Sequence, residues 1–575
     1  MTYRPPLAEI AFALEHLAEL PMLADLPGLQ DADLATTVGA LEEAARFVSD
    51  VISPLGPVGD AAGCTLTDGS VTTPPGTPEA YRRFVEAGWG AISFPTEFGG
   101  GGFPWVATTA VQEMLSSASM GFALCPMLTQ GAVELLLHHG SDEQRATYLP
   151  KLVTGEWTGT MNLTEPDAGS DVGALRTRAV PHADGSYRIS GTKIFITYGD
   201  HDLAENIVHL VLARTPDSPA GTRGISVFVV PKFLVGADGS VGARNAVVCS
   251  KLEHKIGIHA SPTCVLEFED AVGFLIGEEC TGMRSMFTMM NNARLSVALE
   301  GLAVAEAAYQ LARDYAHERV QGRATGAGGR EAVPIAAHPD VRLMLATMKT
   351  QIDAMRGLLY FDAALVDRAG SSPDEAARRA AADLASLLTP VGKAWCTDLG
   401  VELTSIGVQV HGGMGFIEET GAGRLWRDSR IAPIYEGTNG IQAIDLVLRK
   451  LPLGGGAVVG GLLDRVEAEA GPTSEVAMVR LATTTLLAHL SAGRVDEALA
   501  GATPYLRMLG LVLGDWSVQR AATAARTLLG QHPSDPFLHE RIAVAAFYRT
   551  RILPAVAGLA PSVTAGAADL FALAL

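Results

Sequence analysis

The spacing of apolar residues divides the chain into three kinds of segment. In the first part, apolar residues recur at helical spacing over 41–52 and 78–91, with Gly-, Pro- and Thr-rich loops between them. Near residue 158 the pattern changes to short β-branched runs bounded by turn residues, which predict strands at 187–197, 207–213, 224–230 and 263–268. Helical spacing then returns. This order indicates an α+β fold with segregated parts, and it argues against an alternating Rossmann fold.

The helical part after the strands begins with a long element. Residues 283–320 contain one Gly and no Pro, and their apolar positions recur every three to five residues, so we expect one long buried helix. A second helix is predicted to start at Asp340 as N-cap and to reach about Ala369. Farther along, the glycine-rich stretch 453–461 resembles a linker, and helices are predicted at 476–490 and 538–553, with a turn at 531–536.

These patterns predict six parts along the chain. They are an N-terminal extension at 1–34, a helical N-domain at 35–157, a central β domain at 158–272, a helical C-domain at 273–450, a linker at 451–471 and an extra helical C-terminal module at 472–575.

Composition narrows the class of protein. Of the 575 residues, 48% are hydrophobic and 18% charged, which predicts a folded chain with a sizeable core. The net charge of −20 excludes nucleic-acid binding through the overall electrostatic field of the protein. The six cysteines form no C-x-x-C pair and the histidines show no ligand spacing, so we expect free thiols and no metal site.

Membrane and targeting signals are also not expected. The longest uncharged run, 114–133, contains Pro, Gly and several hydroxyl residues, so we read it as a buried segment without an integral membrane span. The first residues carry Glu9, Glu15 and Glu19, which fit neither a secretory signal nor a transit peptide. The sequence therefore predicts a soluble, cytoplasmic protein.

Candidate chemistry begins where the helical part meets the first strand, in Met161-Asn-Leu-Thr-Glu-Pro-Asp-Ala-Gly-Ser-Asp171. Backbone amides, the hydroxyls of Thr164 and Ser170, and glycine-permitted close approach suit an anionic or polar planar ligand. Taken alone, the same residues are equally consistent with a capped turn. They are followed in order by further motifs: Lys193-Ile-Phe-Ile-Thr197, Arg294, Arg319, Gln409-Val-His-Gly-Gly413 and Ile434-Tyr-Glu-Gly-Thr-Asn-Gly-Ile-Gln442.

The order and spacing of these motifs resemble the acyl-CoA dehydrogenase family of flavoenzymes over about residues 35–450. The chain looks most like the larger bacterial members with an N-terminal extension and an extra C-terminal helical domain, a group that includes 3-methylmercaptopropionyl-CoA dehydrogenases. Supporting segments are 255–264, 289–294 and 338–342. The resemblance implies a helical N-domain, a central β-sheet domain and a helical C-domain, with FAD as cofactor.

The resemblance also implies how the cofactor is held. The isoalloxazine ring of FAD would be lined by Met161, Leu163 and Thr164, and covered elsewhere by Phe195, Ile196 and Thr197. Ser170 would contact the phosphate or pantetheine region. The FAD of a neighbouring subunit would be held by Arg319 and the turn from Gln409 to Gly413, and the site would be completed by Thr438 and Gly440.

Glu436 is the predicted catalytic base. Removal of a proton α to a thioester needs a carboxylate in a largely dry pocket, where its pKa can rise toward working pH. The resemblance assigns this role to Glu436, with the backbone N–H of Glu436 and Gly437 at the thioester and Arg294 at the CoA substrate. Some family members place the base one residue before that arginine, but Ala293 stands there, so Glu436 is the base that remains.

Three departures from the family pattern affect the polar contacts. Asn291 stands where many relatives have Asp, Gly440 where many have Gln, and the segment 320–323 lacks the usual aromatic residue.

Arg294 and Arg319 lie 25 residues apart, which in one helix corresponds to ~37 Å on nearly the same face. One helix would then serve the thioester at one end and the flavin phosphates across a subunit boundary at the other. The alternative for Arg319 is an ordinary surface pair with Glu318 or another surface acid.

The leading hypothesis is therefore FAD-dependent α,β-dehydrogenation of an acyl-CoA. Glu436 takes the α-proton, N5 of FAD accepts the β-hydride, and an electron-transferring flavoprotein reoxidises the cofactor, as the resemblance implies. Two alternatives stay open: an oxidase or monooxygenase on the same fold, and a non-catalytic acyl-CoA-binding protein. We expect a homodimer with FAD at the subunit interface, and the module at 472–575 capping part of the outer face. No motif identifies the acyl chain.

Overall fold

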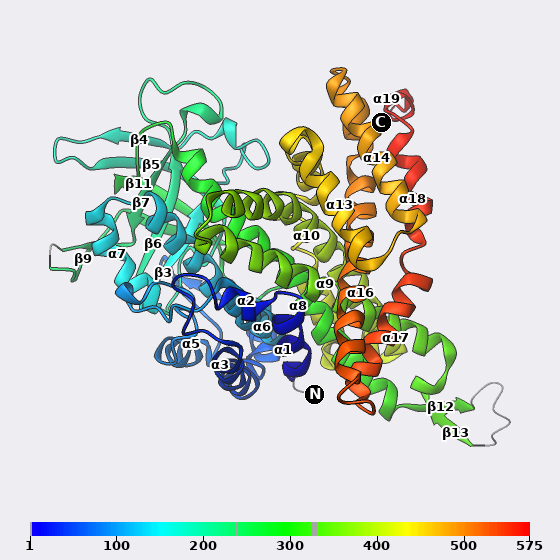
Figure 1. Cartoon of the computed structure of the whole chain (residues 1–575). Coiled ribbons are helices and arrows are strands. Elements are labelled where there is room, and N and C mark those ends of the chain that lie inside the picture. The colour runs from blue at the N-terminus through cyan, green and yellow to red at the C-terminus, as the bar shows by residue number, and fades with distance from the viewer. Residues whose placement is uncertain (1–2, 237, 324–330, 575) are drawn as a thin grey trace.

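The computed structural model describes residues 3–236, 238–323 and 331–574. A β domain lies on one side and the C-terminal helices on the other, with the long helices α8, α9 and α10 between them (Figure 1). This arrangement confirms the predicted α+β class. The first part is helical, with a small hairpin of β1 (Thr65–Thr67) and β2 (Ser70–Thr72), and its helices are α1 (Leu7–His16), α2 (Leu20–Leu23), α3 (Leu34–Phe47), α4 (Leu55–Ala62), α5 (Thr77–Glu86), α6 (Trp105–His139) and α7 (Asp142–Thr154).

The β domain contains a seven-stranded sheet in the order β3-β6-β7-β11-β5-β4, with β10 also paired to β11. Apart from the parallel β3–β6 pair, its strands run antiparallel. The register between β11 and β5 shifts twice. Strand β11 pairs with β5 over residues 263–273 and with β7 at its last two residues, Phe274 and Leu275. The strands are β3 (Trp157–Asn162), β4 (Arg178–Pro181), β5 (Tyr187–Thr197), β6 (Asn206–Ala213), β7 (Ser226–Pro231), β10 (Val247–Leu252) and β11 (Thr263–Leu275), and a separate hairpin joins β8 (Phe233–Val235) to β9 (Val241–Arg244).

The predicted strands all exist. The prediction at 187–197 matches β5, whereas β11 continues seven residues beyond the predicted end at 268. Asp270 in the second register shift has a φ of 57°, so the acidic, turn-like sequence there bends the strand rather than ending it.

The C-domain is organised around α8 (Gly282–Glu318), which confirms the predicted long buried helix. It packs against α6, α9 (Pro339–Ser371) and α10 (Glu375–Val410), so it is covered on several sides. The contact with α10 depends on glycine, because a Cβ at Gly301 would lie 2.2 Å from the carbonyl oxygen of Cys396. The remaining elements of this domain are β12 (Val320–Arg323), β13 (Ala332–Pro334), α11 (Ala422–Ser429) and α12 (Asn439–Asp445).

The start of α9 differs from the prediction. His338 is the N-cap and Pro339 is the first helical residue, so the predicted N-cap, Asp340, lies within the first turn. The fixed φ of proline and its missing N–H favour that first position. Asp340 instead places a negative charge near the N-terminal end of the helix.

The predicted linker at 451–471 is wrong, because most of it is the helix α13 (Ala457–Ala470). Val459, Leu462, Leu463 and Val466 are buried on one face of it. Only the glycines at 454–456, which all have positive φ, form the bend that precedes it. The C-terminal module continues with α14 (Ser474–Ser491), α15 (Val495–Ala500), α16 (Ala502–Leu529), α17 (Pro536–Arg551), α18 (Ala555–Thr564) and α19 (Ala568–Ala572).

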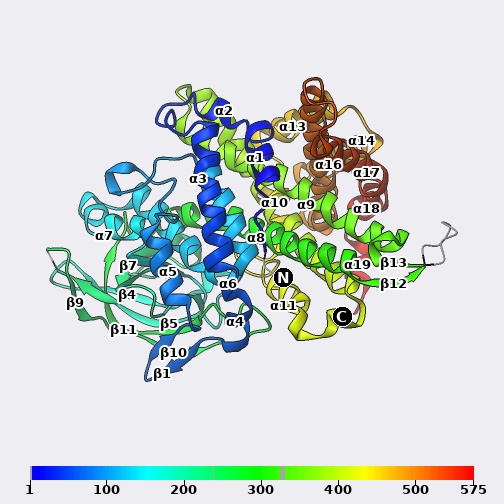
Figure 2. The same cartoon turned by 90° about the horizontal axis from the view of Figure 1, so that it is seen from below.

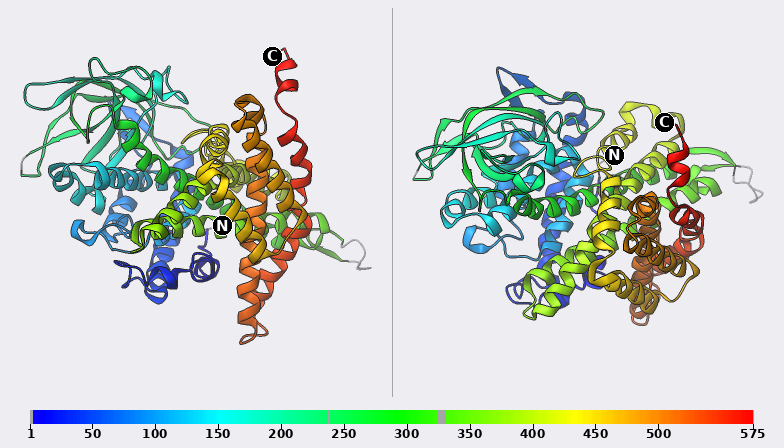
Figure 3. Two further views of the ribbon diagram at one scale, coloured as in Figure 1. Left: turned by 45° about the horizontal axis from the view of Figure 1, so that its top comes forward. Right: turned by 90° about the horizontal axis from the view of Figure 1, so that it is seen from above.

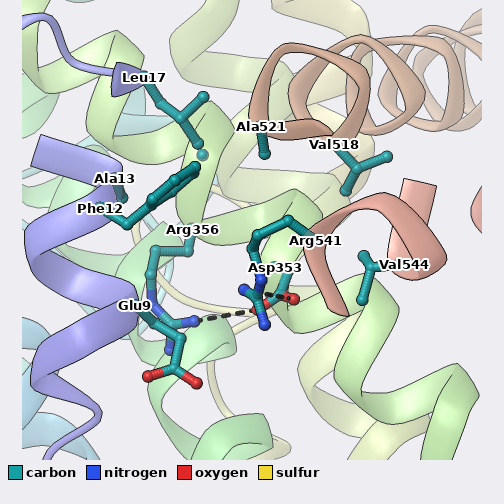
Figure 4. A pocket seen from close by; sticks show the side chains of 11 residues that line it. Glu9, Phe12, Ala13, Leu17, Asp353, Arg356, Val518, Ala521, Arg541 and Val544 are labelled. Atoms are coloured by element: carbon teal, nitrogen blue, oxygen red, sulfur yellow. Dashed lines mark hydrogen bonds and ion pairs between the residues drawn. The ribbon is translucent and has the colours of Figure 1, made fainter. Parts of the chain in front are cut away.

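The N-terminal extension joins the C-domain and the C-terminal module. Helix α1 packs against both α9 and α16, as Figure 2 and Figure 3 also show. Glu19, just after α1, binds Arg368 of α9 at 2.5 Å and Arg520 of α16 at 2.9 Å. A small cavity of about 20 Å³ lies between α1, α9, α16 and α17 (Figure 4). The three parts therefore form one packed body at this junction.

Helix α6 meets the length and apolar composition of a membrane span, and 89% of that apolar stretch is buried inside the protein. Two bent helix pairs, Asn439–Lys450 with Leu453–Ala470 and Pro536–Arg551 with Ala555–Thr564, meet the same test jointly. Because α6 packs against α8 and β3, its apolar character is explained by its place in the core.

Candidate active site

Glu436 lies in the turn between α11 and α12. The turn is closed by the backbone N–H of Asn439, which donates to the carbonyl oxygen of Pro433 at 3.0 Å. Glu436 has a φ of 56°, a left-handed conformation that costs a residue with a side chain of order 1 kcal/mol or more and persists where neighbours enforce it. The next residue, Gly437, also has positive φ, and a Cβ there would lie 3.0 Å from Nε2 of Gln442.

Helix α10 supplies the groups that hold this turn. Lys393, which is completely buried, donates from Nζ to the carbonyl oxygen of Gly437 and to Oδ1 of Asn439, both at 2.9 Å. Asn439 in turn donates from Nδ2 to Asp398 at 2.7 Å. From the other side, Gln442 donates to the carbonyl oxygen of Glu436 at 3.0 Å. The backbone around Glu436 is thus fixed by side chains of α10 and α12.

The electrostatics of the site suit a general base. Burial raises the pKa of Glu436 to about 7, while the positive charges of Arg294 and Lys393 act in the opposite direction. Arg294 is 6% exposed, and its closest acidic partner, Asp445, is 3.6 Å away. Burial also lowers the pKa of Lys393 to about 8, although the negative charges of Glu436 and Glu300 act to raise it. A carboxyl group that titrates near pH 7 can accept a proton at neutral pH and release it afterwards.

A second buried acid, Glu300, joins the same site from α8. Its Oε2 accepts a hydrogen bond from the hydroxyl of Tyr435, the residue before Glu436. Burial raises the pKa of Glu300 to about 8, and the charge of Glu436 acts in the same direction. The sequence reasoning missed Glu300, although it is the single charged residue between Arg294 and Glu306.

Three further residues of this site were also missed. Asn439 and Gln442 lie inside a recognised motif but were given no role. Lys393 stands alone among apolar residues in the stretch 387–396. A lone charge in an otherwise apolar helical run is the signal that would have indicated both Lys393 and Glu300.

The residues predicted to line the flavin ring lie where β3 and β5 end. The backbone N–H of Ile194 donates to the carbonyl oxygen of Thr164 at 2.9 Å, which joins the two segments. Buried Lys193 strengthens this junction, since its Nζ donates to the carbonyl oxygen of Leu163 at 2.9 Å and to Glu165 at 2.8 Å. Met161 is near the end of β3, and Ser170 is exposed in the following loop.

Phe195, Ile196 and Thr197 do not share one face. Phe195 is 59% exposed and has a φ of 60°, whereas the side chain of Ile196 is buried in the core of the sheet. Thr197 lies half-buried opposite Thr263. The exposed ring of Phe195 lies on a segment joined to the one that carries Thr164, and together they supply an apolar ring and hydroxyl groups, a combination that fits the isoalloxazine of a flavin.

A third group lies at the far end of α8. Arg319 directly follows the helix, and its guanidinium donates to Gln321 at 3.3 Å. Among the described residues, no ion pair between Arg319 and Glu318 occurs. Gln409 and Gly413 are exposed at the end of α10, next to His411, whose ring stacks on Tyr315 of α8 at 4.6 Å. Thr438, the N-cap of α12, and Gly440 lie beside Glu436 instead. The predicted residues therefore form three sets: one around Glu436 beside the middle of α8, one at the C-terminal end of α8, and one where β3 and β5 end.

Comparison with known proteins places these features in a family. Models of the acyl-CoA dehydrogenase N-terminal, middle and C-terminal domains match residues 34–156, 160–271 and 281–451. A model described as acetyl-CoA dehydrogenase C-terminal like matches residues 468–574. The chain is also 46% identical to a 3-methylmercaptopropionyl-CoA dehydrogenase of Ruegeria pomeroyi, over 96% of both chains. The chain belongs to the acyl-CoA dehydrogenase family.

Other relatives agree with this membership. A butyryl-CoA dehydrogenase of Syntrophomonas wolfei is 36% identical over 97% of this chain and 96% of its own. The structure of butyryl-CoA dehydrogenase from Megasphaera elsdenii has a TM-score of 0.58 and 27% identity, covering 71% of this chain and 96% of that one. Caenorhabditis elegans ACDH-11, solved with C11-CoA, is 22% identical with a TM-score of 0.76 over 95% and 92% of the two chains, and it shows the shared fold including the C-terminal module.

Family membership confirms the predicted reaction class, which is FAD-dependent dehydrogenation of an acyl-CoA. It favours neither the oxidase or monooxygenase alternative nor the non-catalytic acyl-CoA-binding protein. A solved acyl-CoA dehydrogenase from Bacillus anthracis is complexed with FAD, in agreement with the flavin-like chemistry at the edge of the sheet.

Proposed function

We propose that the protein dehydrogenates a short-chain acyl-CoA and that Glu436 removes the α-proton of the thioester. The observation that carries this proposal is the position of Glu436, a carboxylate with a pKa of about 7 on a turn held by Lys393 and Gln442. FAD, when bound, supplies the acceptor for the β-hydrogen and the electrons. The protein contributes the orientation of the base and a largely dry site.

The turn also offers groups for the thioester oxygen. Among the residues that the structure describes, no acceptor is found for the backbone N–H of Glu436 or Gly437. Both donors belong to the fixed turn, so their positions do not depend on flexible side chains. Such donors stabilise the negative charge that develops on the thioester oxygen as the α-proton leaves. Buried Arg294 adds a positive charge to the same site and is proposed to face the CoA substrate.

We assign the flavin contacts as follows. Met161, Leu163, Thr164, Phe195 and Thr197 line the ring with their side chains, and Ile196 contributes through its backbone because its side chain lies in the core. Ser170 contacts the phosphate or pantetheine region, and Thr438 and Gly440 contact the cofactor beside the base. Arg319 and Gln409–Gly413 lie at the C-terminal end of α8, away from the base, and they serve the FAD of a second subunit.

A homodimer follows from this assignment. The surface around the turn after α10 carries exposed apolar side chains, among them Phe416 at 90% and Met414 at 49% exposure, as expected for a contact between subunits. We propose an electron-transferring flavoprotein as the electron acceptor. A particle mass of one 60.2 kDa chain in light scattering would contradict the dimer.

The proposed substrate class rests on the relatives. The names 3-methylmercaptopropionyl-CoA dehydrogenase and butyryl-CoA dehydrogenase both denote enzymes of short acyl thioesters. A panel of acyl-CoAs of increasing length, followed by bleaching of the flavin absorbance, tests this choice. Faster bleaching with long-chain than with butyryl or 3-methylmercaptopropionyl thioesters would contradict it.

Replacement of the base tests the mechanism. Glu436→Gln keeps the shape of the side chain but cannot accept the proton, so the rate of flavin bleaching should fall by ~10²–10⁴-fold or more. Glu42→Gln, a change of an exposed glutamate on α3 away from the proposed subunit contact, is the matched control and should bleach at the wild-type rate. Stopped-flow reoxidation by air and by the flavoprotein then compares the two acceptors. Wild-type bleaching in Glu436→Gln would show that another group is the base.

A further inference from the structure

Glu300 is a buried acid whose hydrogen bonding is incomplete. It is 1% exposed, and while its Oε2 accepts from Tyr435, its Oε1 has no partner among the described residues. Among the described residues, no side chain of α8 forms a hydrogen bond or an ion pair with it. An isolated carboxylate in such surroundings would be strongly disfavoured, and the neutral acid is the form that burial selects.

The position of Glu300 links it to the base. Tyr435 is directly joined to Glu436, and its hydroxyl is anchored on Glu300 from α8, opposite the groups that α10 supplies. We propose that Glu300 is a positioning residue for the base: its carboxyl group holds the Tyr435–Glu436 segment on α8 through the tyrosine hydroxyl, and its ionisation adds a negative charge that opposes the one developing in the transition state. This inference rests on the proposed role of Glu436.

The other charged groups that face Glu300 set the order of ionisation. Glu436 on the turn and Lys393 on α10 act on Glu300, whereas both Arg294 on α8 and Lys393 act on Glu436. Two positive charges therefore favour the ionised form of Glu436, whereas the charge of ionised Glu436 disfavours ionisation of Glu300. Glu436 thus ionises first and Glu300 second, which places the active form between the two steps.

The second ionisation adds a negative charge that acts on Glu436 and thus on the site where the transition state becomes negative. Like charges in a partly desolvated site repel, so we expect the rate to fall by roughly tenfold. The wild-type kcat/KM for flavin reduction should then rise through about pH 7 and fall through about pH 8. Lys393, whose pKa burial lowers to about 8, is the competing explanation for the fall.

Glu300→Gln separates these explanations. The amide can still accept from Tyr435 through its oxygen, but it cannot ionise, so the rise near pH 7 should remain and the fall near pH 8 should disappear. Above pH 9 the variant should exceed the wild type by roughly tenfold. The matched control is Asp362→Asn, which also replaces a buried acid whose pKa burial raises far above its ordinary value, on α9. The control should keep the wild-type profile.

A second measurement compares the wild type with Glu300→Gln. The infrared carbonyl band of protonated carboxylic acids should lose one titrating component in the variant, whereas the components near pH 7, to which Glu436 and buried Asp367 contribute, should remain. An unchanged band in the variant would overturn the inference, as would a fall in rate near pH 8 that survives in Glu300→Gln or disappears in Asp362→Asn. An active Glu436→Gln would instead overturn the proposed function, so the two failures can be distinguished.

Discussion

Two glutamates of helix α8 lie six residues apart and are both buried, yet their surroundings are opposite. Glu306 accepts from Arg356 at 2.7 Å and from Gln310 at 2.9 Å, so each carboxylate oxygen is paired. Burial alone would raise its pKa, but the positive charges of Arg356 and Lys349 hold it below the ordinary value. Within the described part of the chain Glu300 has one hydrogen-bond partner, the neutral hydroxyl of Tyr435, and burial raises its pKa to about 8.

The surroundings of Glu306 form a structural network. Arg356, 2% exposed, also binds Glu113 from α6 at 2.7 Å and Asp353 at 3.4 Å. Asp353 in turn pairs with Arg541 of α17 at 2.9 Å (Figure 4), which ties the C-terminal module to the C-domain. Its pKa is held below the ordinary value, because the positive charges of Arg541, Lys349 and Arg356 outweigh the effect of burial.

The comparison shows what complete pairing does to a buried acid. A fully paired carboxylate stays ionised, holds its neighbours and has little capacity to exchange protons. An incompletely paired one is kept neutral until near pH 8 and can respond to a change of charge nearby. One helix therefore carries a stabilising acid toward the module and a responsive acid toward the catalytic turn.

The largest expected effect comes from breaking the paired network. Arg356→Met leaves Glu113, Glu306 and Asp353 without their shared cation, which should reduce the free energy of unfolding by about 3–5 kcal/mol. Equilibrium urea unfolding measures this loss. Arg379→Met, in an exposed pair with Glu375, is the control and should change stability by less than ~1 kcal/mol. If both variants lost the same free energy of unfolding, the buried network would stabilise the fold no more than an exposed ion pair does.

The pH dependence of stability gives the next effect. The folded state keeps the proton of Glu300 up to about pH 8, whereas the unfolded chain loses it near its ordinary value of about 4.3. The folded state thus binds more protons between these values, so this group makes stability fall as pH rises through that window.

Glu300→Gln removes that dependence. Its free energy of unfolding relative to the wild type should increase by roughly 3 kcal/mol between pH 5 and pH 8. Urea unfolding at the two pH values measures the change. A constant difference between variant and wild type would show that Glu300 is not neutral in the folded state.

Much of the fold could be predicted from local patterns, since the strand β5 and the long helix α8 follow directly from periodicity. The motif residues around Glu436 could be found as well, because they are adjacent in sequence. Glu300 and Lys393 reach that turn only through packing of α8 and α10, and no local pattern encodes this contact. The helix at 457–470 was missed for a related reason, because the preceding glycines conceal a face that is buried by packing against α10, α14 and α16.

The smallest effect comes from a matched pair of tyrosines. The hydroxyl of Tyr360 donates to paired Glu113 at 2.7 Å, and that of Tyr435 donates to Glu300. Loss of a hydrogen bond to a charged acceptor costs about 1.5–3 kcal/mol, and loss of one to a neutral acceptor about 0.5–1.5 kcal/mol. Tyr360→Phe should therefore destabilise the protein more in urea unfolding but leave flavin bleaching unchanged. Tyr435→Phe should destabilise it less but slow bleaching, because the turn that carries Glu436 loses its anchor on α8. The opposite ranking in either measurement would contradict the assignment of the Glu113–Arg356–Glu306 network to stability and of Glu300 to the catalytic turn.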